Sequence, residues 1–472
     1  MKRLILLIMP ILLVCCNRPA ENGPGQEDGT GIMAEGWITS PQKGVLFTKH
    51  AGELEFMTTG NTDPAIVVDT TQRFQEIDGF GNCLTGGSAI LLNKMRLAER
   101  TVLLRELFSP DGNGIGISYL RITIGASDLS DRVFTYCDLP QGETDPQMEQ
   151  FSIEPEKADL IPVLKEILAI NPSLKILGSP WTAPLWMKTN NASVGGSLKH
   201  EWFDAYARYF VKYIQAMQAE GINIDAITVQ NEPLHGGNNP SMVMTAADQA
   251  LFIRQNLGPA FAAAGIKTKI IIYDHNADRT DYPLTVLNDA GARQYIDGSA
   301  FHLYGGSIDA LTAVHEAYPS KNLYFTEQWV GGPGNLSEDL KWHVENLIIG
   351  ATRNWCRNVI EWNLASDPLY DPHTEGGCDR CLGTVTLSGN NVTRNPAYYI
   401  LAHAAKHVRP GSVRVSTNTL GNIPNVAFQT PEGRKVLIVV NTTPDKRNFN
   451  VKFRGNTLPL SLDGGAVGTW IW

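Results

Sequence analysis

The chain of 472 residues is too long for one small module, so it suits either one large barrel with an accessory layer or two to three ordinary domains. Hydrophobic residues at 43% and charged residues at 18% exclude a largely disordered chain, which would have too little apolar surface to bury. With 39 Lys and Arg against 48 Asp and Glu, the net charge of -9 provides no basic surface for phosphates, so a neutral ligand is favoured over nucleic acid.

The N-terminus has the pattern of an export signal. Lys2 and Arg3 precede an apolar run that ends at Val14 and is too short to cross a bilayer core. The run continues into Cys15 and Cys16, which resembles a bacterial lipoprotein cleavage box with Cys16 as the acylated residue. We therefore predict a lipoprotein signal peptide over residues 1–16 and a flexible, Pro- and Gly-containing tether over residues 17–36. Such a lipid would be the protein's sole membrane contact, in the periplasm, the outer membrane or at the cell surface.

The first two candidate strands lie in an N-terminal flank over residues 37–75, at positions 54–57 and 65–69. A C-terminal flank over residues 409–472 carries further β-rich runs (NVAFQ, KVLIVVN, NVKF and TWIW). Both flanks have an antiparallel pattern, and chain ends usually lie close together. We predict that they form one β-sandwich side domain, attached to the central domain of a monomer.

Between the flanks, short apolar runs alternate with amphipathic stretches. Runs that are apolar throughout are typical of strands buried on both faces, which favours parallel pairing. Eight candidate strands cover residues 77–80, 119–124, 175–178, 227–230, 269–274, 298–303, 323–326 and 359–363. Helical periodicity between them includes residues 90–108, 202–220, 248–264 and 340–354. This order predicts an α/β fold, a (β/α)8 TIM barrel over residues 76–408, more simply than an open doubly wound sheet.

The cysteines do not form a complete disulfide framework. The chain has 7 cysteines, and an odd number remains once Cys15 and Cys16 are set aside. Cys378 and Cys381 form a CxxC in a glycine-rich loop. Zinc would need a second such pair and a redox motif would begin a helix, so a small loop disulfide or two reduced thiols remain as interpretations.

Two glutamates follow apolar strands directly, at the barrel mouth where active sites lie. Glu232 is in AITVQNEP and Glu327 is in LYFTEQW, on strands four and seven, which face each other across the mouth. Two carboxyl groups that meet in one cleft are what glycoside hydrolysis needs, one to protonate the leaving oxygen and one to attack the sugar. A single Glu here would more often be an ion-pair partner, but two, with Trp181 and Trp362 as stacking surfaces, favour catalysis.

The motifs around these residues resemble those of glycoside hydrolase family 30, the glucosylceramidase-like retaining enzymes. They are FQEIDGFG (74–81), YLRITIGASDLSDRVFTYCD (119–138), ILGSPWTAPLWMKTN (176–190), VQNEP (229–233), FHLY (301–304), YFTEQW (324–329) and EWNLA (361–365). Together they are far more specific than NEP alone and extend over nearly all of the predicted mature chain. The resemblance implies a retaining β-glycoside hydrolase that uses neither a cofactor nor a metal.

The resemblance also implies roles for individual residues. Glu232 would be the general acid/base and Glu327 the nucleophile. The implied substrate-binding residues are Asp128, Trp181, Asn231, His235, Tyr304 and Trp362, with Arg121 and His302 behind them. An arginine bonded to the nucleophile would keep Glu327 ionised while Glu232 stays protonated. Plain hydrogen bonding at the barrel mouth is the alternative for Arg121, His302 and Tyr304, and His235 could instead cap a helix.

One segment departs from the family and another suggests a branch of it. Residues 82–88 read NCLTGGS, without the acidic residue that the family often has there. Residues 234–242, LHGGNNPSM, resemble the bacterial and fungal β-1,6-glucanase branch, which implies an endo-β-1,6-glucanase acting on β-glucan or its oligosaccharides. The alternatives are an exo-acting β-glucosidase, a glucosylceramidase or a β-xylosidase of the same family, and a non-catalytic surface glycan-binding lipoprotein.

Overall fold

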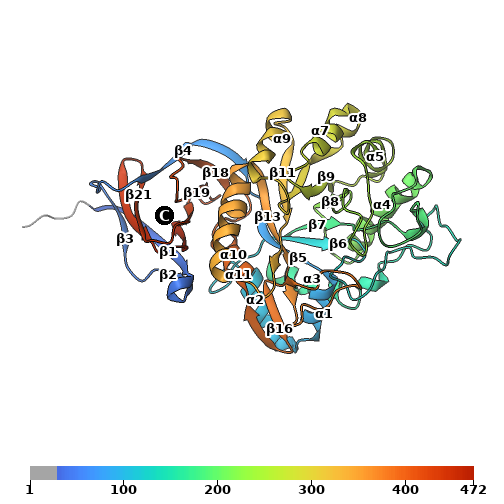
Figure 1. The fold of residues 1–472 in the computed structure, drawn as a ribbon, viewed down its shortest axis with the longest axis horizontal. Helices are drawn as coiled ribbons and strands as arrows, with labels where there is room; N and C mark the ends of the chain where they lie inside the picture. Colours follow the sequence, from blue (N-terminus) through green and yellow to red (C-terminus); the bar gives the residue numbers. More distant parts are fainter. Residues whose placement is uncertain (1–28) are drawn as a thin grey trace, which may run out of the picture.

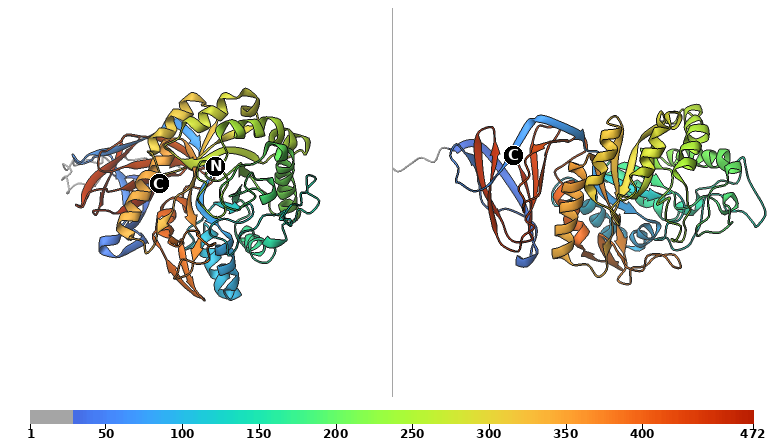
Figure 2. Two further views of the ribbon diagram at one scale, coloured as in Figure 1. Left: turned by 45° about the vertical axis from the view of Figure 1, so that its right-hand side comes forward. Right: turned by 45° about the horizontal axis from the view of Figure 1, so that its top comes forward.

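A computed structural model describes residues 29–472, in which a closed β-barrel lies beside a β-sandwich (Figures 1 and 2). The predicted signal peptide and residues 17–28 of the predicted tether lie outside the described residues. The tether prediction was wrong for residues 29–36, because strand β1 (Gly29–Ser40) already begins there. Ala34 and Gly36 of this strand are buried whereas Glu35 is exposed, so the segment follows the period-two alternation of a half-buried strand.

The barrel consists of eight parallel strands, as predicted. They are β5 (Gly79–Leu84), β6 (Tyr119–Thr123), β7 (Lys175–Ser179), β8 (Ala226–Thr228), β9 (Lys269–Asn276), β10 (Ile296–His302), β11 (Asn322–Glu327) and β13 (Cys356–Asn363). Each predicted strand overlaps an observed one. The first lies a few residues later than predicted, because the buried polar Asn82 belongs to β5 and breaks the apolar run there.

Helices surround the barrel and connect its strands (Figure 1). They are α1 (Gly86–Lys94), α2 (Leu97–Phe108), α3 (Leu160–Ile170), α4 (Phe203–Ala219), α5 (Ala246–Phe252), α6 (Gly258–Ala263), α7 (Asp281–Asn288), α8 (Ala290–Arg293), α9 (Leu311–Ala317), α10 (Leu336–His343) and α11 (Pro396–Ala405). Short 3-10 turns cover Pro41–Lys43, Glu154–Glu156, Leu185–Met187, His200–Trp202 and Ile308–Ala310. Two expected helices contain π-helical segments, at Ile253–Leu257 and Val344–Ala351. Within residues 29–472, no helix has the length and hydropathy that a membrane span requires.

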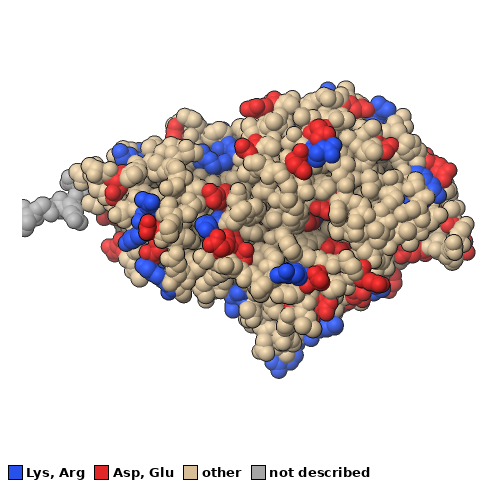
Figure 3. All heavy atoms as spheres, in the orientation of Figure 1, with Lys and Arg blue, Asp and Glu red and all other residues tan. Residues whose placement is uncertain are grey.

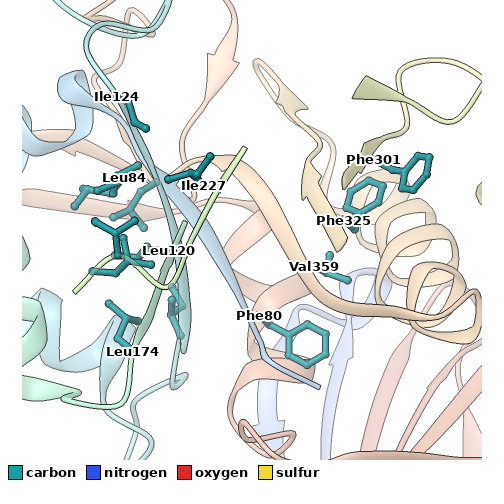
Figure 4. Packing of buried hydrophobic residues seen from close by; sticks show 14 of the residues in the cluster. Phe80, Leu84, Leu120, Ile124, Leu174, Ile227, Phe301, Phe325 and Val359 are labelled. Atoms are coloured by element: carbon teal, nitrogen blue, oxygen red, sulfur yellow. The ribbon is translucent and has the colours of Figure 1, made fainter. Parts of the chain in front are cut away.

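Side chains on the outer faces of the barrel strands pack against the surrounding helices. Leu120, Ile227 and Phe325 belong to this large apolar core (Figure 4). Inside the barrel a separate apolar layer fills the centre, made of Tyr119, Leu177, Ala226, Ile271, Ala300, Tyr324 and Ile360. The barrel is therefore a packed core and not a pore.

The layer above it, toward the carboxyl ends of the strands, is polar. On six strands, the residue two positions after the one in the apolar layer is also buried and belongs to this second layer. These residues are Arg121, Ser179, Thr228, His302 and Thr326, which are polar, and Trp362. Strand β9 reaches this layer through a register shift between Tyr273 and His275, where Asp274 is the additional residue. A bulge of this kind redirects a side chain, and here it brings a carboxylate into the barrel centre.

The sandwich is built from both chain ends, as predicted. Its strands, in spatial order, are β2 (Val45–Lys49), β1, β23 (Val467–Ile471), β20 (Lys435–Val440), β19 (Asn425–Gln429), β18 (Val413–Thr417), β4 (Ala65–Glu76), β21 (Arg447–Phe453), β22 (Asn456–Leu462) and β3 (Leu54–Met57). The pairing is antiparallel except between β4 and β21, which is parallel. Helix α11 joins the two domains, since His403 lies 2.8 Å from the hydroxyl of Thr39 and 2.9 Å from that of Thr469.

Two short sheets lie in the loops at the barrel mouth. One pairs β12 (Val330–Gly331) with β15 (Cys381–Leu382), and the other contains β14 (Ala365–Ser366), β16 (Val385–Ser388) and β17 (Asn391–Arg394). The first sheet ties the loop that follows β13 to the residues that follow Glu327.

A buried ion cluster closes the opposite end of the barrel. The carboxylate of Asp78 accepts hydrogen bonds from Lys175 and Arg357, each at 2.9 Å from its Oδ1. Burial would raise the pKa of Asp78, but the bonds and charges of Arg357 and Lys175 outweigh burial and lower it. Because the folded-state pKa lies below the unfolded one, this stabilisation is present at neutral pH and is lost as the pH falls through the folded pKa.

Replacing Asp78 should therefore destabilise the fold. We expect Asp78→Ala to lower the free energy of unfolding by roughly 2 kcal/mol at pH 7, since it removes the buried carboxylate that Lys175 and Arg357 share. Urea denaturation measures this loss, with Asp445→Ala as the control at an exposed aspartate. Equal stability of the two variants would contradict the assigned role.

Candidate active site

A pocket of about 300 Å³ opens at the carboxyl ends of the barrel strands. It is lined by Asp128, Trp181, Glu232, His235, Asn238, His275, Asn276, Tyr304, Glu327, Trp329, Trp362, Cys378 and Cys381. A larger cavity of about 530 Å³ lies among the residues at the strand starts, including Asp78 and Lys175, and so at the opposite end. The mouth pocket is the candidate site because the two predicted catalytic glutamates meet there.

Glu232 and Glu327 lie on opposite sides of this pocket. Glu327 is the last residue of β11, and Glu232 follows β8. Carboxyl oxygens of both residues and a ring nitrogen of His302 lie within 4.8 Å of one another. This spacing suits the short separation of about 5 to 5.5 Å in retaining glycosidases and leaves no room for the water that the wider inverting arrangement holds.

The backbone that carries this site is strained. Glu232 has φ 45°, and Tyr273 and Asp274 have φ 71° and 68°, in the left-handed region that side chains with a Cβ seldom adopt. The amide of Glu232 donates to the carbonyl oxygen of Asp274 at 3.0 Å, so the strained segments hold each other. Such strain costs about 1 to 3 kcal/mol per residue and persists where surrounding structure enforces it.

The buried ion pair of Arg121 and Asp274 organises the base of the pocket. Arg121 donates at 2.7 Å to Asp274 and at 2.5 Å to Glu327. Asp274 also accepts hydrogen bonds from three hydroxyl groups, those of Ser179, Thr228 and Thr326. Burial opposes ionisation of Asp274, but Arg121 and His302 reverse this and hold its pKa far below the usual range.

His302 links Asp274 to the two predicted catalytic glutamates. Its Nε2 lies 3.1 Å from Asp274, and its Nδ1 lies 3.3 Å from Glu232 and 3.9 Å from Glu327. Burial would lower the pKa of His302, but the charge of Glu327 and the bonds to Asp274 and Glu232 raise it to about 9. The ring is therefore an imidazolium near neutral pH and donates from both nitrogens.

The two glutamates have different electrostatic surroundings. Burial raises the pKa of Glu327, against the charges of His302 and Arg121. Burial acts in the same direction on Glu232, but the hydrogen bond from His302 and the charges of His302, His275 and His235 together outweigh it and lower the pKa of Glu232. These directions are the reverse of the expected ones, which were an ionised Glu327 and a protonated Glu232. The proton nearest to Glu232 is held on His302 Nδ1. Transfer across this bond produces the acid form of Glu232.

The opposite wall of the pocket presents aromatic rings and a carboxyl group. The rings of Trp181 and Trp362 stack at 5.3 Å, and Arg121 lies 4.8 Å from the Trp181 ring. Burial, together with the charges of Glu327 and Glu232, raises the pKa of Asp128 to about 7. This wall combines apolar ring surface with a hydrogen-bonding group, the arrangement that a sugar ring and its hydroxyls require.

Most predicted site residues line the pocket and three lie behind it. Arg121 and His302 are fully buried beneath the glutamates. Asn231 is also behind, and its Oδ1 accepts from Arg121 at 2.7 Å, which leaves its Nδ2 group for a ligand. The hydroxyl of Tyr304 donates to Glu327 at 3.0 Å, so this residue contacts both the pocket and the nucleophile.

Several residues of the site were not predicted from the sequence. They are Asn238, Asp274, His275, Asn276, Trp329, Cys378 and Cys381. A signal existed for three of them, because the polar run of Asp274 to Asn276 follows the apolar KIIIY of strand five directly. No comparable pattern distinguished the cysteines, which form the loop disulfide, one of the two interpretations left open. In the described part of the chain, Cys83, Cys137 and Cys356 are free and buried.

Glu232, His302 and Glu327 also have the spacing of metal ligands. Arg121 already neutralises one of these carboxylates, and the imidazolium form of His302 has no lone pair to offer. The donor set therefore suits a proton network better than a cation.

Comparisons with known proteins agree with this geometry. The model of the glycosyl hydrolase family 30 TIM-barrel domain matches residues 77–408, and that of the family's beta sandwich domain matches residues 411–470. Endo-1,6-beta-D-glucanase neg1 of Aspergillus fumigatus is 35% identical over 425 residues, which cover 84% of this chain and 85% of that protein. Lysosomal acid glucosylceramidase of Mus musculus is 28% identical over 92% of this chain and 88% of its own length.

Two solved structures are similar to this chain over most of its length. The endo-beta1,6-glucanase BT3312 has a TM-score of 0.85 and 36% identity, covering 93% of this chain and 99% of that one. SrfJ from Salmonella typhimurium has a TM-score of 0.87 and 26% identity, with the same coverage of both chains. Both the barrel and the sandwich therefore have counterparts in solved structures.

The pKa of His302 provides a test of the assigned proton network. We expect Glu327→Gln to lower this pKa by about 1, because it removes the largest charge that raises it. Histidine-selective NMR titration of the folded protein measures the change. Glu143→Gln, at an exposed loop position, is the control and should leave the titration of His302 as it is. An unchanged pKa in Glu327→Gln would contradict the coupling.

Proposed function

The chain belongs to glycosyl hydrolase family 30, and from this we propose that it is an endo-β-1,6-glucanase that hydrolyses its substrate with retention of configuration. The observation that carries the proposal is the meeting of Glu232 and Glu327 within 4.8 Å in one pocket, beside the stacked pair of Trp181 and Trp362. Relatives named endo-1,6-β-glucanase, at 35% and 36% identity over most of the chain, support the choice of linkage.

In the first step Glu327 attacks the anomeric carbon. The bond from that carbon to the leaving oxygen breaks, and Glu232 delivers a proton to this oxygen. His302 supplies that proton to Glu232 across their 3.3 Å contact before the bond breaks, and is left as the neutral imidazole. Arg121 and Tyr304 hold the two oxygens of Glu327, so the carboxylate is oriented before it attacks.

In the second step a water molecule replaces the leaving group. Glu232, now a carboxylate, removes a proton from this water as its oxygen attacks the anomeric carbon. The bond between the sugar and Glu327 breaks, and the nucleophile regains its charge beside Arg121. Two inversions at the same carbon give net retention, and the proton that Glu232 took from water returns to His302 Nδ1, which restores the starting state.

The remaining pocket residues bind the sugar. Asp128 and the Nδ2 group of Asn231 supply hydrogen bonds to hydroxyls, and bonds that strengthen as the oxocarbenium character develops lower the barrier. Trp181 and Trp362 supply apolar ring surface. His235 is exposed at the rim, in the loop that follows the acid/base, where a second sugar unit would lie.

The surface charge suits a neutral glycan. On the face shown in Figure 3, Lys and Arg occur in small groups among Asp and Glu, without a broad basic area.

We further propose that the enzyme is a monomer held to a bacterial membrane by a lipid on Cys16, as the sequence before residue 29 suggests. Metabolic labelling with a fatty acid, compared between the parent chain and Cys16→Ala, tests the anchor.

Substitution of the two glutamates should give different kinetic signatures. Glu327→Ala should abolish turnover of every substrate, since no glycosyl-enzyme forms. Glu232→Ala should lower kcat on β-1,6-glucan by about 10²- to 10⁴-fold. It should have little effect on formation of the glycosyl-enzyme from aryl glycosides, because their leaving groups need little proton donation. Steady-state and burst kinetics distinguish the two variants. Near-parental activity in Glu327→Ala, or equal losses on both substrates in Glu232→Ala, would contradict the roles.

Product analysis tests the substrate assignment. We expect a ladder of oligosaccharides from β-1,6-glucan early in the reaction, with the β-anomer formed first in NMR spectra, because endo cleavage with retention produces both. Gentiobiose, an aryl β-glucoside and an aryl β-xyloside serve as comparison substrates. Release of glucose alone would favour the exo-acting β-glucosidase alternative, and preference for the xyloside would favour a β-xylosidase.

A further inference from the structure

We propose that the Cys378–Cys381 disulfide is a positioning element of the sugar-binding pocket, where it forms part of the wall and holds its loop against Asp128 and Trp329. The inference rests on the proposed function, because it takes the pocket to be the sugar site. Its consequence is that reduction of this disulfide weakens substrate binding in a folded enzyme.

Both sulfur-bearing residues face the pocket. Cys378 and Cys381 line it together with Asp128 and the two glutamates. Cys381 is 4% exposed and packs in a small cluster with Trp181 and Trp362, against which Cys378 and Trp329 also pack. The disulfide therefore lies in the pocket wall beside the rings on which a sugar would stack, and its loss would remove part of their packing.

One side of the disulfide loop is anchored to the loop of Asp128. The amide of Thr374 donates to the carbonyl oxygen of Asp128 at 2.9 Å. Gly377 lies so close that a Cβ there would come within 2.4 Å of that same oxygen, so only glycine permits the approach. Hydrogen bonding from the Cys378 backbone favours the charged form of the Asp128 carboxyl and opposes the rise of its pKa.

The other side is anchored next to the nucleophile. Cys381 pairs with Gly331 in the short sheet of β12 and β15, which begins three residues after Glu327. The amide of Gly332 donates to the carbonyl oxygen of Arg380 at 2.8 Å, and the Arg380 side chain returns a hydrogen bond to Gly332. The turn of residues 378–381 is thus the connection between the Asp128 loop and the Glu327 loop.

The sequence of this connection explains why a cross-link is needed. Residues 374–381 read TEGGCDRC, and adjacent glycines leave a loop with wide conformational freedom. The disulfide removes that freedom where the loop meets the pocket. A cross-link over so short a segment adds less to global stability than one over a long loop, so its effect should be local.

The shortest bonds to the catalytic pair come from the barrel, and this loop reaches Glu232 only indirectly, through the hydrogen bond of Thr374 to Asn239. Glu232 and Glu327 are held by Arg121, His302 and Asp274, which are fully buried in the barrel. Loosening the pocket wall should therefore raise KM and leave kcat nearly unchanged. This result is expected when the lost contacts stabilise the bound substrate and the transition state equally.

The first test is reduction of the native disulfide. Cys378 is half-buried and borders the pocket, so a small dithiol can reach it. Dithiothreitol gives two electrons and two protons to the disulfide, which becomes two thiols while the reagent closes to its cyclic disulfide. The full chain carries Cys15→Ser and Cys16→Ser, so that these two positions form no additional disulfide. Thiol titration confirms complete reduction, and circular dichroism confirms the fold.

We expect reduction to raise KM for β-1,6-glucan by about five- to tenfold, with kcat within about twofold. Cys378→Ser/Cys381→Ser should show the raised KM without dithiothreitol and no further response to it. Asp379→Ala, an exposed change in the same turn that keeps both sulfurs, is the matched control and should respond as the parent does. An unchanged KM after complete reduction would overturn the proposal, as would a fall in kcat and Tm with constant KM.

Failure of the proposed function has a different signature. A parent chain that does not cleave β-1,6-glucan contradicts the linkage, whatever the disulfide does. The same KM comparison is then made on the aryl glycoside that the parent does cleave, where a rise on reduction supports the positioning role and a constant KM overturns it.

Discussion

The active site depends on one buried ion pair, between Arg121 and Asp274 at the centre of the barrel. Both side chains are fully removed from solvent, and each would be unstable there alone. Arg121 is shared with Glu327, and Asp274 is shared with His302, so this pair fixes one catalytic group on each side. The hydroxyl groups on β7, β8 and β11 donate the remaining hydrogen bonds to the Asp274 carboxylate. Removing either partner would leave a buried, unpaired charge next to the groups that hold both glutamates, so stability and catalysis share this interaction.

The barrel places the residues that stabilise the fold and the residues of the active site in two separate layers. The lower layer is apolar and packs tightly, whereas the layer above it is polar and holds charge. The strained backbone at Glu232 and Asp274 lies at the upper boundary, where the apolar layer below and the helices outside enforce it. The sandwich, joined through α11, lies on the barrel's flank, and nothing in the pocket comes from it. Its contribution to the site is therefore indirect.

Much of the site could be predicted because catalytic barrels place function at strand ends. Glu232, Glu327 and the tryptophans were identifiable from their positions after apolar runs and from the family motifs. Asp274 was not singled out, although YDHN follows strand five, because a strand-end aspartate alone does not reveal a bulge that turns it inward. The proton distribution was also mispredicted in part, since the position of His302 between Asp274 and Glu232 depends on strands five and six being neighbours.

The sequence by itself determined the alternation of strands and helices and the sandwich from the two chain ends, and it predicted the pair of glutamates that meet in the pocket. These follow from local periodicity and from motifs that are continuous along the chain. Only the tertiary structure decided that residues 29–36 belong to the sandwich, that Asp274 pairs with Arg121, and that Cys378 and Cys381 join in the pocket wall. Each of these depends on contacts between segments far apart in sequence, and no local pattern encodes which distant surface a side chain will meet.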